Sequence, residues 1–282
     1  MLGLADPLTL LLVLSGTAFI AKFLDTSIGM GYGTALTPVL LLAGFEPLAI
    51  VPAVLASELG PGLLAALAHH RAGNARLIPH SLAMATAAAP AGAGAMRILR
   101  HALPMDLKIA LFIAFTSIAG TGLAVLLAVK INKMALEIYI GSLVAATGVY
   151  LLASRHTQRA LSIGRLAGLS LVASFNKGLS GGGYGAIITG GQIITGVEGR
   201  NAVAITSLCK SLTSIVGFGL YLLTHSVSQW PLVLCLCIGA VLSVPLGAAA
   251  VKRAHPQGLK VAISIACILL GALTLIKTFV AY

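Results

Sequence analysis

The sequence predicts an all-α, polytopic membrane protein built from two homologous halves. Only 9% of its 282 residues are charged, whereas 58% are hydrophobic. A soluble domain carries roughly a quarter charged residues, so too little polar surface is available for folding in water. Apolar runs of the length that spans a bilayer recur along the chain. A glycine-rich segment also occurs twice, and this repeat predicts the two halves.

Short polar stretches separate the apolar segments, each of which is expected to form a helix or part of one. The first segment has no Lys or Arg before it and no small-residue cleavage site, so we expect a membrane helix and not a removed signal peptide. The segments are 7–26, 30–44, 48–68, 80–98, 107–129, 135–153, 165–177, 184–195, 201–224, 231–251 and 260–281.

Segment 80–98 is rich in Ala and Gly and only weakly hydrophobic, so the sequence leaves open whether it crosses the membrane. Cytoplasmic loops carry an excess of Lys and Arg. That rule is best satisfied when 69–108, 155–165 and 252–260 all lie in the cytoplasm, which requires that 80–98 does not cross fully.

The glycine-rich repeat consists of "GMGYGTALTPVLLLAGFE" at 29–46 and "GGGYGAIITGGQIITGVE" at 181–198, offset by 152 residues. We therefore expect one half at 1–153 and the other at 154–282, with inverted orientations. The two copies share seven positions: Gly29/Gly181, Gly31/Gly183, Tyr32/Tyr184, Gly33/Gly185, Thr37/Thr189, Gly44/Gly196 and Glu46/Glu198.

Each glycine-rich copy lies between short apolar pieces, as in broken or re-entrant membrane helices. Paired interrupted segments in the two halves of a membrane protein point to a substrate site between repeats. Exposed backbone N–H groups are tolerated at membrane depth only where they face protein or a wet cavity. The amino terminus of a broken helix attracts anions. We therefore expect two such ends to face one anion near the middle of the membrane.

Charged residues inside membrane segments are functional candidates because burying them is costly. They are Lys22, Asp25, Glu58, Lys177 and Lys210. The 152-residue offset matches Asp25 with Lys177 and Glu58 with Lys210. We expect the two second-half lysines to hold an anion, while Asp25 and Glu58 pair with them or carry a coupled proton. The alternative is that these residues form two buried ion pairs that lock the halves together.

Polar and glycine residues near the two breaks complete the predicted substrate site. Hydroxyl and amide groups donate hydrogen bonds to oxyanions, although Ser and Thr are also ordinary packing residues between membrane helices. The tyrosines either line the cavity or pack against it. The predicted substrate-binding residues are Gly31, Tyr32, Gly33, Thr34, Ser57, Asn176, Lys177, Gly182, Gly183, Tyr184, Gly185, Ser207 and Lys210.

Other function classes find little support in the sequence. No nucleophile has a matched base, so we do not expect an enzyme, and neither glycine stretch ends in the Gly-Lys-Ser/Thr of a phosphate loop. His69, His70, His80 and His101 are expected in polar loops beside Arg and lack metal-ligand spacing, so we expect no metal and no cofactor. The net charge of +11 is scattered over short loops, which argues against nucleic acid as a partner.

An ion channel remains an alternative because the triplet "GYG" occurs in both copies, as in the filter of potassium channels. That filter needs four parallel copies around one axis. Buried lysines beside the triplets also disfavour a cation pore, so the carrier hypothesis is preferred.

The stretch "GMGYGTALTPVLLLAGFEPLAI", the later "AHHRAGN" and the second copy "SFNKGLSGGGYGAIITGGQIITG" together resemble the TauE/SafE family of membrane permeases. Two departures are Gly190, which stands where the first copy has Pro38, and region 80–108, which looks like an insertion. The resemblance implies proton-coupled export of sulfite, sulfoacetate or another organosulfonate across the bacterial inner membrane. It leaves open which sulfur anion is carried, the direction of flux and the oligomeric state.

Overall fold

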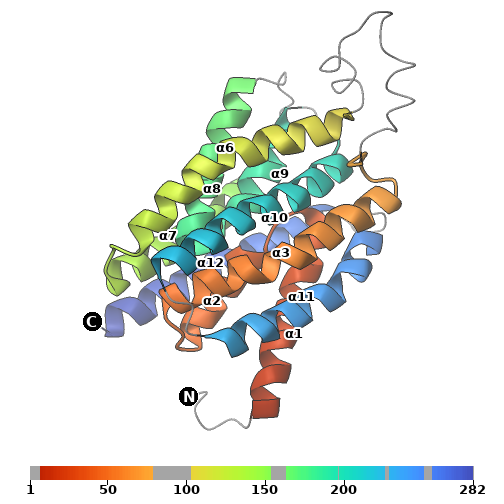
Figure 1. Ribbon diagram of the computed structural model, residues 1–282. Helices are drawn as coiled ribbons and strands as arrows, with labels where there is room; N and C mark the ends of the chain where they lie inside the picture. Colours follow the sequence, from red (N-terminus) through yellow and green to blue (C-terminus); the bar gives the residue numbers. More distant parts are fainter. Residues whose placement is uncertain are drawn as a thin grey trace, which may run out of the picture.

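A computed structural model describes residues 7–78, 103–153, 163–195, 197–225, 229–250 and 256–281. Within these ranges the regular secondary structure is entirely helical, which confirms the all-α prediction (Figure 1). The helices are α1 (Pro7–Ile28), α2 (Tyr32–Leu42), α3 (Pro47–Arg71), α6 (Met105–Ala128), α7 (Lys133–Ala153), α8 (Ile163–Ser180), α9 (Tyr184–Ile194), α10 (Gly199–Thr224), α11 (Trp230–Ala250) and α12 (Pro256–Ala281).

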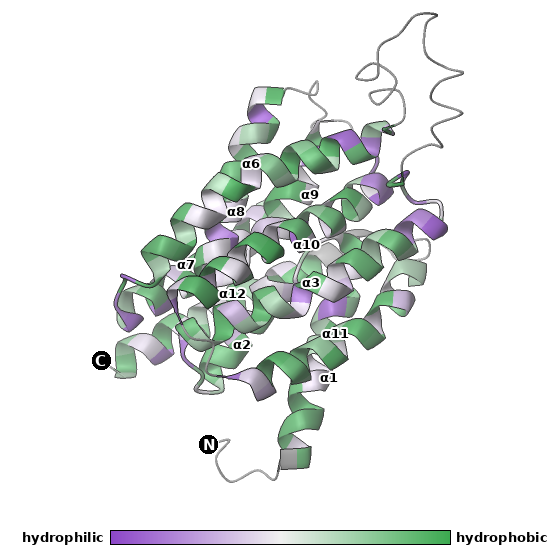
Figure 2. Ribbon diagram, in the orientation of Figure 1, coloured by the Kyte–Doolittle hydropathy of each residue, from purple (hydrophilic) through white to green (hydrophobic). Residues whose placement is uncertain are grey.

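Seven helices among the described residues are long and apolar enough to cross a bilayer: α1, α3, α6, α7, α10, α11 and α12. Large apolar side chains lie on the outside of the bundle, including Phe115, Leu223 and Val280, the last two more than 80% exposed. Figure 2 shows apolar residues along the helices and hydrophilic ones gathered at helix ends, with a few in the interior. An apolar exterior of this kind is suited to lipid, so the chain is a multi-pass membrane protein.

Local sequence explains where several helices begin and end. Pro47 is the first residue of α3 and follows Glu46, the N-cap residue. Proline is favoured there because its fixed φ suits the first turn and its missing N–H would have no helical partner. Gly44, in the turn that precedes it, has a φ of 100°. Further prolines lie inside α2, α3 and α11, which membrane helices tolerate when neighbouring groups satisfy the backbone.

Polar contacts define two opposite ends of the helix bundle. At one end, Arg76 N–H donates to the Asp106 carboxylate (2.8 Å), and Asn201 donates to the same carboxylate (3.2 Å). The end of α3 and the starts of α6 and α10 therefore meet there, and we call this end the Arg71 face. At the other end, which we call the Glu46 face, Lys133 lies 3.1 Å from Glu46.

The Glu46 face also includes the ends of α2 and α12, because Lys277 Nζ donates to the Leu41 carbonyl (2.5 Å). The segment between α3 and α6 thus leaves and returns at the Arg71 face. Segment 80–98, whose crossing the sequence left open, lies outside the described residues.

Close contacts through small residues give the relative directions of the helices, as expected where membrane helices approach closely. α1 runs parallel to α11, with Ser15 bonded to the carbonyl of Cys235 and Ser27 to that of Gly247. α6 runs parallel to α8, because Gly120 lies against Ser174 and Gly178 against Ala124.

Two other helix pairs run antiparallel. In α3 and α10, Gly62 lies against Ser211 and Gly217 lies against Leu55. In α7 and α12, Gly141 lies against Leu275 and Gly148 against Ile268. These four pairings form the bundle around the two short helices, α2 and α9.

The 152-residue offset between the two glycine-rich segments also matches helices of the two halves. Shifting α2 (Tyr32–Leu42) by 152 residues gives the bounds of α9 (Tyr184–Ile194), and α3 and α10 begin at matching positions. Both short helices follow a glycine break and precede a long helix. This arrangement brings the two breaks into the interior of the bundle.

Candidate functional site

The glycines of the two breaks adopt matching backbone conformations. Gly29 has a φ of 78° and its counterpart Gly181 one of 73°, while Gly31 and Gly183 have φ values of 121° and 80°. Residues with a Cβ rarely adopt these angles, which explains why glycine occupies both positions in both copies. The positive φ values end α1 and α8 and allow the chain to start α2 and α9 in a new direction.

The two breaks touch each other in a reciprocal way. A Cβ atom added to Gly33 would overlap the carbonyl oxygen of Gly181, and one added to Gly185 would overlap that of Gly29. Each break therefore packs against the first turn of the short helix from the other half. Direct backbone packing of this kind is possible only because these positions lack a side chain.

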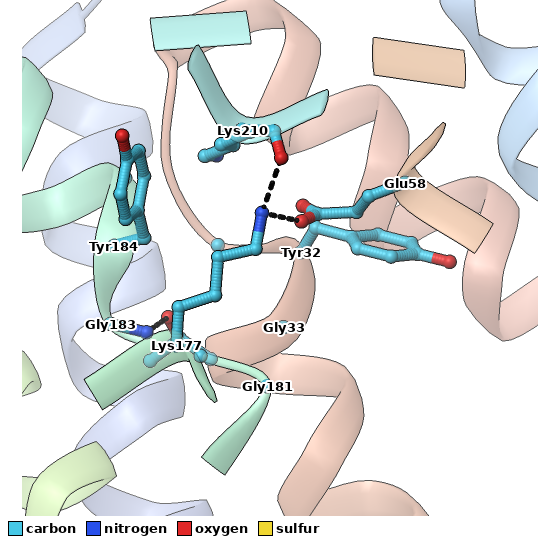
Figure 3. A pocket seen from close by; sticks show the side chains of 12 residues that line it. Tyr32, Gly33, Glu58, Lys177, Gly181, Gly183, Tyr184 and Lys210 are labelled. Carbon is cyan, nitrogen blue, oxygen red and sulfur yellow. Dashed lines mark hydrogen bonds and ion pairs between the residues drawn. The ribbon is translucent and has the colours of Figure 1, made fainter. Parts of the chain in front are cut away.

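A small cavity lies where the breaks meet (Figure 3). Its cavity volume is about 10 Å³. That space holds roughly one water. A larger anion therefore requires the breaks to move apart. The lining consists of Gly31, Tyr32, Gly33, Thr34, Glu58, Lys177, Gly181, Gly182, Gly183, Tyr184, Gly185 and Lys210.

Backbone N–H groups of two helix amino termini point into this region. The first turn of an α-helix leaves its N–H groups without intrahelical partners. In the second break, Gly182 N–H donates to Ser180 Oγ (3.1 Å) and Gly183 N–H donates to Thr34 Oγ1 (3.0 Å). Among the described residues, the N–H groups of Tyr32 and Tyr184 have no such partner. These donors and the positive ends of two helix dipoles favour a negatively charged guest.

Five charged side chains form a buried network beside the cavity, each at most 4% exposed. Lys177 Nζ lies 2.5 Å from Glu58 and donates to the backbone carbonyl of Lys210 (2.8 Å), as Figure 3 shows. Lys210 Nζ is ion-paired with Asp25 and donates to the carbonyl of Gly29 (3.2 Å). Lys22 connects the two pairs, at 3.0 Å from Asp25 and 3.9 Å from Glu58.

The two strong ion pairs are counterparts of each other with reversed polarity. Lys177 matches Asp25 in the offset, and Lys210 matches Glu58. The pair Lys177–Glu58 therefore corresponds to the pair Asp25–Lys210, and each pair joins the two halves. Buried charges need a close partner of opposite sign, and both pairs meet that requirement. With three lysines against two carboxylates, the fully ionised network carries one excess positive charge.

Two buried tyrosines flank the network. Lys22 Nζ lies 5.0 Å from the centre of the Tyr32 ring, and Lys177 Nζ lies 5.3 Å from that of Tyr184. These are cation–π distances. The Tyr32 hydroxyl is 2.6 Å from Ser57 Oγ, and the Tyr184 hydroxyl is 3.1 Å from Ser117 Oγ. Both rings are thereby fixed in the cavity wall.

The structure brings most of the predicted substrate-binding residues together. Ten of them line the cavity, along with Glu58, which was predicted to couple protons. The other four predicted residues lie behind the lining. Ser57 holds Tyr32, Asn176 accepts a hydrogen bond from Tyr139 (2.5 Å), Ser207 donates to the backbone of Val203, and Asp25 holds Lys210.

Three residues that contribute to the site were not assigned a role from the sequence. Lys22 was noted as a buried charge, but its offset counterpart is Ser174, so the repeat gave it no matching charge. Ser117 and Tyr139 come from α6 and α7, outside the repeated segment, and only the packing of those helices brings them to the site. Their sequence positions carried no signal.

The expectation that His69 lies in a polar loop was wrong. His69 is completely buried in the last turn of α3, because that turn packs inside the bundle while Arg71 reaches the surface. Among the described residues, no group of three or more His, Cys, Asp or Glu side chains is arranged to hold a metal ion.

A protein-family model described as "Sulfite exporter TauE/SafE" matches residues 75–274, more than half of the chain. The chain belongs to the TauE/SafE family. This confirms the resemblance seen in the sequence and makes the protein a membrane transporter of that family. No curated protein and no solved structure matches the chain. The TauE/SafE match includes the second break, Lys177 and Lys210, whereas the first break, Asp25 and Glu58 precede it.

Proposed function

We propose that this protein is a secondary transporter that exports a small sulfur-containing anion, such as sulfite or an organosulfonate. One observation carries the proposal: two glycine breaks, two helix amino termini and two lysines converge on one buried cavity. Unpaired N–H groups and lysine ammonium groups recognise oxyanions through charge-assisted hydrogen bonds. Membership of the TauE/SafE family supports a sulfur oxyanion as the cargo.

The excess charge of the network favours an anion with one negative charge. Three buried lysines face two buried carboxylates, so a single negative charge neutralises the site. A dianion would leave a buried negative charge unless a proton came with it, and burying net charge is costly. Hydrogensulfite and simple sulfonates have the favoured charge. Lys177 and Lys210 would contact the anion because both line the cavity.

We further propose that the two halves are inverted repeats whose broken helices are re-entrant. The antiparallel packing of α3 against α10, which the 152-residue offset makes equivalent, supports an inverted relationship. The last helices of the two halves, α7 and α12, also pack antiparallel. The break after α1 would then open toward one face and the break after α8 toward the other. Rocking of the halves around the shared site would give alternating access.

Proton coupling follows from competition for the lysines. An anion that binds Lys177 and Lys210 draws them away from Glu58 and Asp25. Each carboxylate then loses its strongest partner while it remains buried, and protonation removes the cost of its charge. Binding of the anion would thereby favour uptake of a proton at Asp25 or Glu58, and release of one would favour release of the other. Charge balance makes this coupling strongest for a dianion, because a dianion and one proton together leave the network neutral.

We propose that the Arg71 face lies in the cytoplasm of a bacterial cell whose inner membrane holds the protein. In the described residues, Arg71, Arg76, Lys108, Arg165 and Arg200 belong to the helix ends of this face. Lys130, Lys133 and Lys277 belong to the Glu46 face. The excess of basic residues at the Arg71 face matches the positive-inside rule.

Flux measurements in proteoliposomes test the function. The panel contains sulfite, sulfoacetate, taurine, thiosulfate, chloride and potassium, with and without a pH gradient. Saturable flux of a sulfur anion that changes with the pH gradient supports the carrier. Lys210→Ala should abolish or strongly reduce it, whereas Lys130→Ala removes one exposed surface charge and serves as the matched control. Unchanged affinity in a folded Lys210→Ala protein would overturn the assignment of that lysine.

An ion channel, the alternative function, predicts a different result in the same flux measurements. A channel built on the two "GYG" triplets would give fast, non-saturating potassium or chloride conductance that does not depend on the pH gradient. Two lysines line the cavity between the triplets, and their buried positive charge repels potassium. These features favour the carrier.

A further inference from the structure

His69 is a buried titratable residue that the proposed anion site does not use. Its side chain is completely buried in the last turn of α3. The ring Nδ1 lies 3.0 Å from the Asn74 side-chain amide, which is itself 2% exposed and belongs to the loop that follows α3. Asn74 Oδ1 is buried without a hydrogen-bond partner among the described residues. Leaving buried polar atoms unpaired costs free energy unless another polar group or a water molecule forms a hydrogen bond with them.

The imidazole lies between the ion network and the Arg71 face. It lies against the backbone of Thr26 in α1, the residue that follows Asp25. Asp25 and Lys22 are the charged side chains that act on it electrostatically. The neighbouring His70 is turned elsewhere, with its Nδ1 3.2 Å from the carbonyl of Ala75. His69 is therefore connected on one side to the loop of the Arg71 face and on the other to the helix turn that holds Asp25.

The equivalent position in the second half shows what is unusual about His69. A shift of 152 residues matches His69 with Tyr221 and Thr26 with Gly178. The Tyr221 hydroxyl donates to the carbonyl of Gly178 (2.9 Å) and is completely buried. Both residues thus contact the last turns of the helix that precedes a glycine break. The contact is the same in the two halves, but one half uses an imidazole and the other a phenol.

That difference is chemical and not merely steric. An imidazole can take up and release a proton, whereas a phenol keeps its proton until strongly alkaline pH. A tyrosine suffices where the contact serves only to hold the helix end. A histidine at this position adds a proton-carrying group on the side of the Arg71 face.

We propose that His69 relays protons between the Arg71 face and the carboxylate of Asp25. This inference rests on the proposed proton-coupled transport. The imidazole takes up a proton from the Arg71 face beside Asn74 and passes a proton to a carboxylate oxygen of Asp25 once the bound anion has drawn Lys210 away. The neutral imidazole is thereby restored, and the reverse sequence returns the proton. Tyr221 supplies no such route toward the Glu46 face.

Two transport assays on the same proteoliposomes test the relay. Net flux driven by a pH gradient requires proton transfer, whereas exchange of labelled for unlabelled anion at equal pH does not. His69→Gln keeps a hydrogen-bonding side chain of similar size, and His69→Tyr copies the second half. Both variants should lose about a hundredfold or more of proton-driven flux, the lower end of the range for removing a proton-transfer group, while exchange is retained. Tyr221→Phe is the matched control and should not alter the ratio of the two rates.

The outcomes separate the relay from the transport function. If the wild-type protein moves no sulfur anion in either assay, the proposed function fails and the relay fails with it. If wild-type flux is proton-driven but the His69 variants retain it, the relay alone is overturned. If the variants lose exchange and proton-driven flux in equal proportion, His69 is a structural residue, and this also overturns the relay.

Discussion

The ammonium group of Lys177 lies 2.5 Å from the Glu58 carboxylate, although the two residues belong to different halves of the chain and are both almost completely buried. The equivalent ion pair joins Lys210 to Asp25, so in both pairs the first half supplies the acid and the second half the base. Buried ion pairs add little net stability over apolar packing, but breaking one leaves an unpaired buried charge. The pairs therefore link the halves, and in the proposed mechanism they are the groups that an incoming anion separates.

Lys177→Gln should destabilise the protein by roughly 3–5 kcal/mol, because Glu58 is left buried without its closest cation. Glu58→Gln should do the same to Lys177. The double variant should be more stable than the sum of the two losses implies, since neither charge is left behind. Thermal unfolding of the three variants in detergent measures this. Strict additivity would show that the two side chains do not interact.

Gly33→Ala should impair folding or transport, because its Cβ would overlap the Gly181 carbonyl in the opposing break. Overpacking of this kind costs about 1–3 kcal/mol. Gly60→Ala is the matched control, since it meets no atom within 4 Å and lies inside α3. It should be neutral or slightly stabilising. Equal behaviour of the two variants, measured as melting temperature and flux, would contradict the close packing of the breaks.

Lys22→Gln should lower anion affinity, because it removes the cation that gives the network its excess positive charge. Both interhalf ion pairs remain in this variant, so the protein should still fold. We expect a loss of about tenfold in affinity, which corresponds to about 1.4 kcal/mol. Equilibrium binding of the transported anion to detergent-purified protein measures the effect, with Lys130→Gln as the surface control. An unaltered dissociation constant would show that Lys22 only supports the ion pairs.

Thiol labelling tests the orientation of the chain. Lys130→Cys and Arg200→Cys place exposed thiols at the Glu46 and Arg71 faces in a background without Cys209, Cys235, Cys237 and Cys267. A membrane-impermeant maleimide added to intact spheroplasts should label the cysteine at position 130. The cysteine at position 200 should react only after permeabilisation. The reverse pattern would place the Arg71 face outside the cell.

Much of this architecture could be predicted from the sequence because the repeat is local and ungapped. The offset that aligns the two "GYG" triplets also aligns the positive φ values of Gly29 and Gly181, and it matches α2 with α9. Backbone conformation at a glycine break depends on nearby residues, so the same local pattern gives the same turn twice. The sequence also identified the four charges that form the interhalf ion pairs.

Which acid meets which base could not be predicted, because partner choice depends on how the two halves pack. The offset matches Asp25 with Lys177, yet the structure joins Asp25 to Lys210. The role of Lys22 and the burial of His69 were missed for a similar reason. Lys22 has no charged counterpart, and "HHR" is polar in composition, so only the packing of α1 and α3 reveals where these side chains lie.

The distribution of charge between the halves also determines which assemblies are disfavoured. Asp25 and Glu58 both come from the first half, whereas Lys177 and Lys210 both come from the second. Two first halves docked in the same way would bring two carboxylates together at each contact, with one Lys22 per half to offset them. Two second halves would bring together only lysines. Like charges in a buried contact oppose such homotypic pairing, so a first half should associate with a second half in preference to a copy of itself.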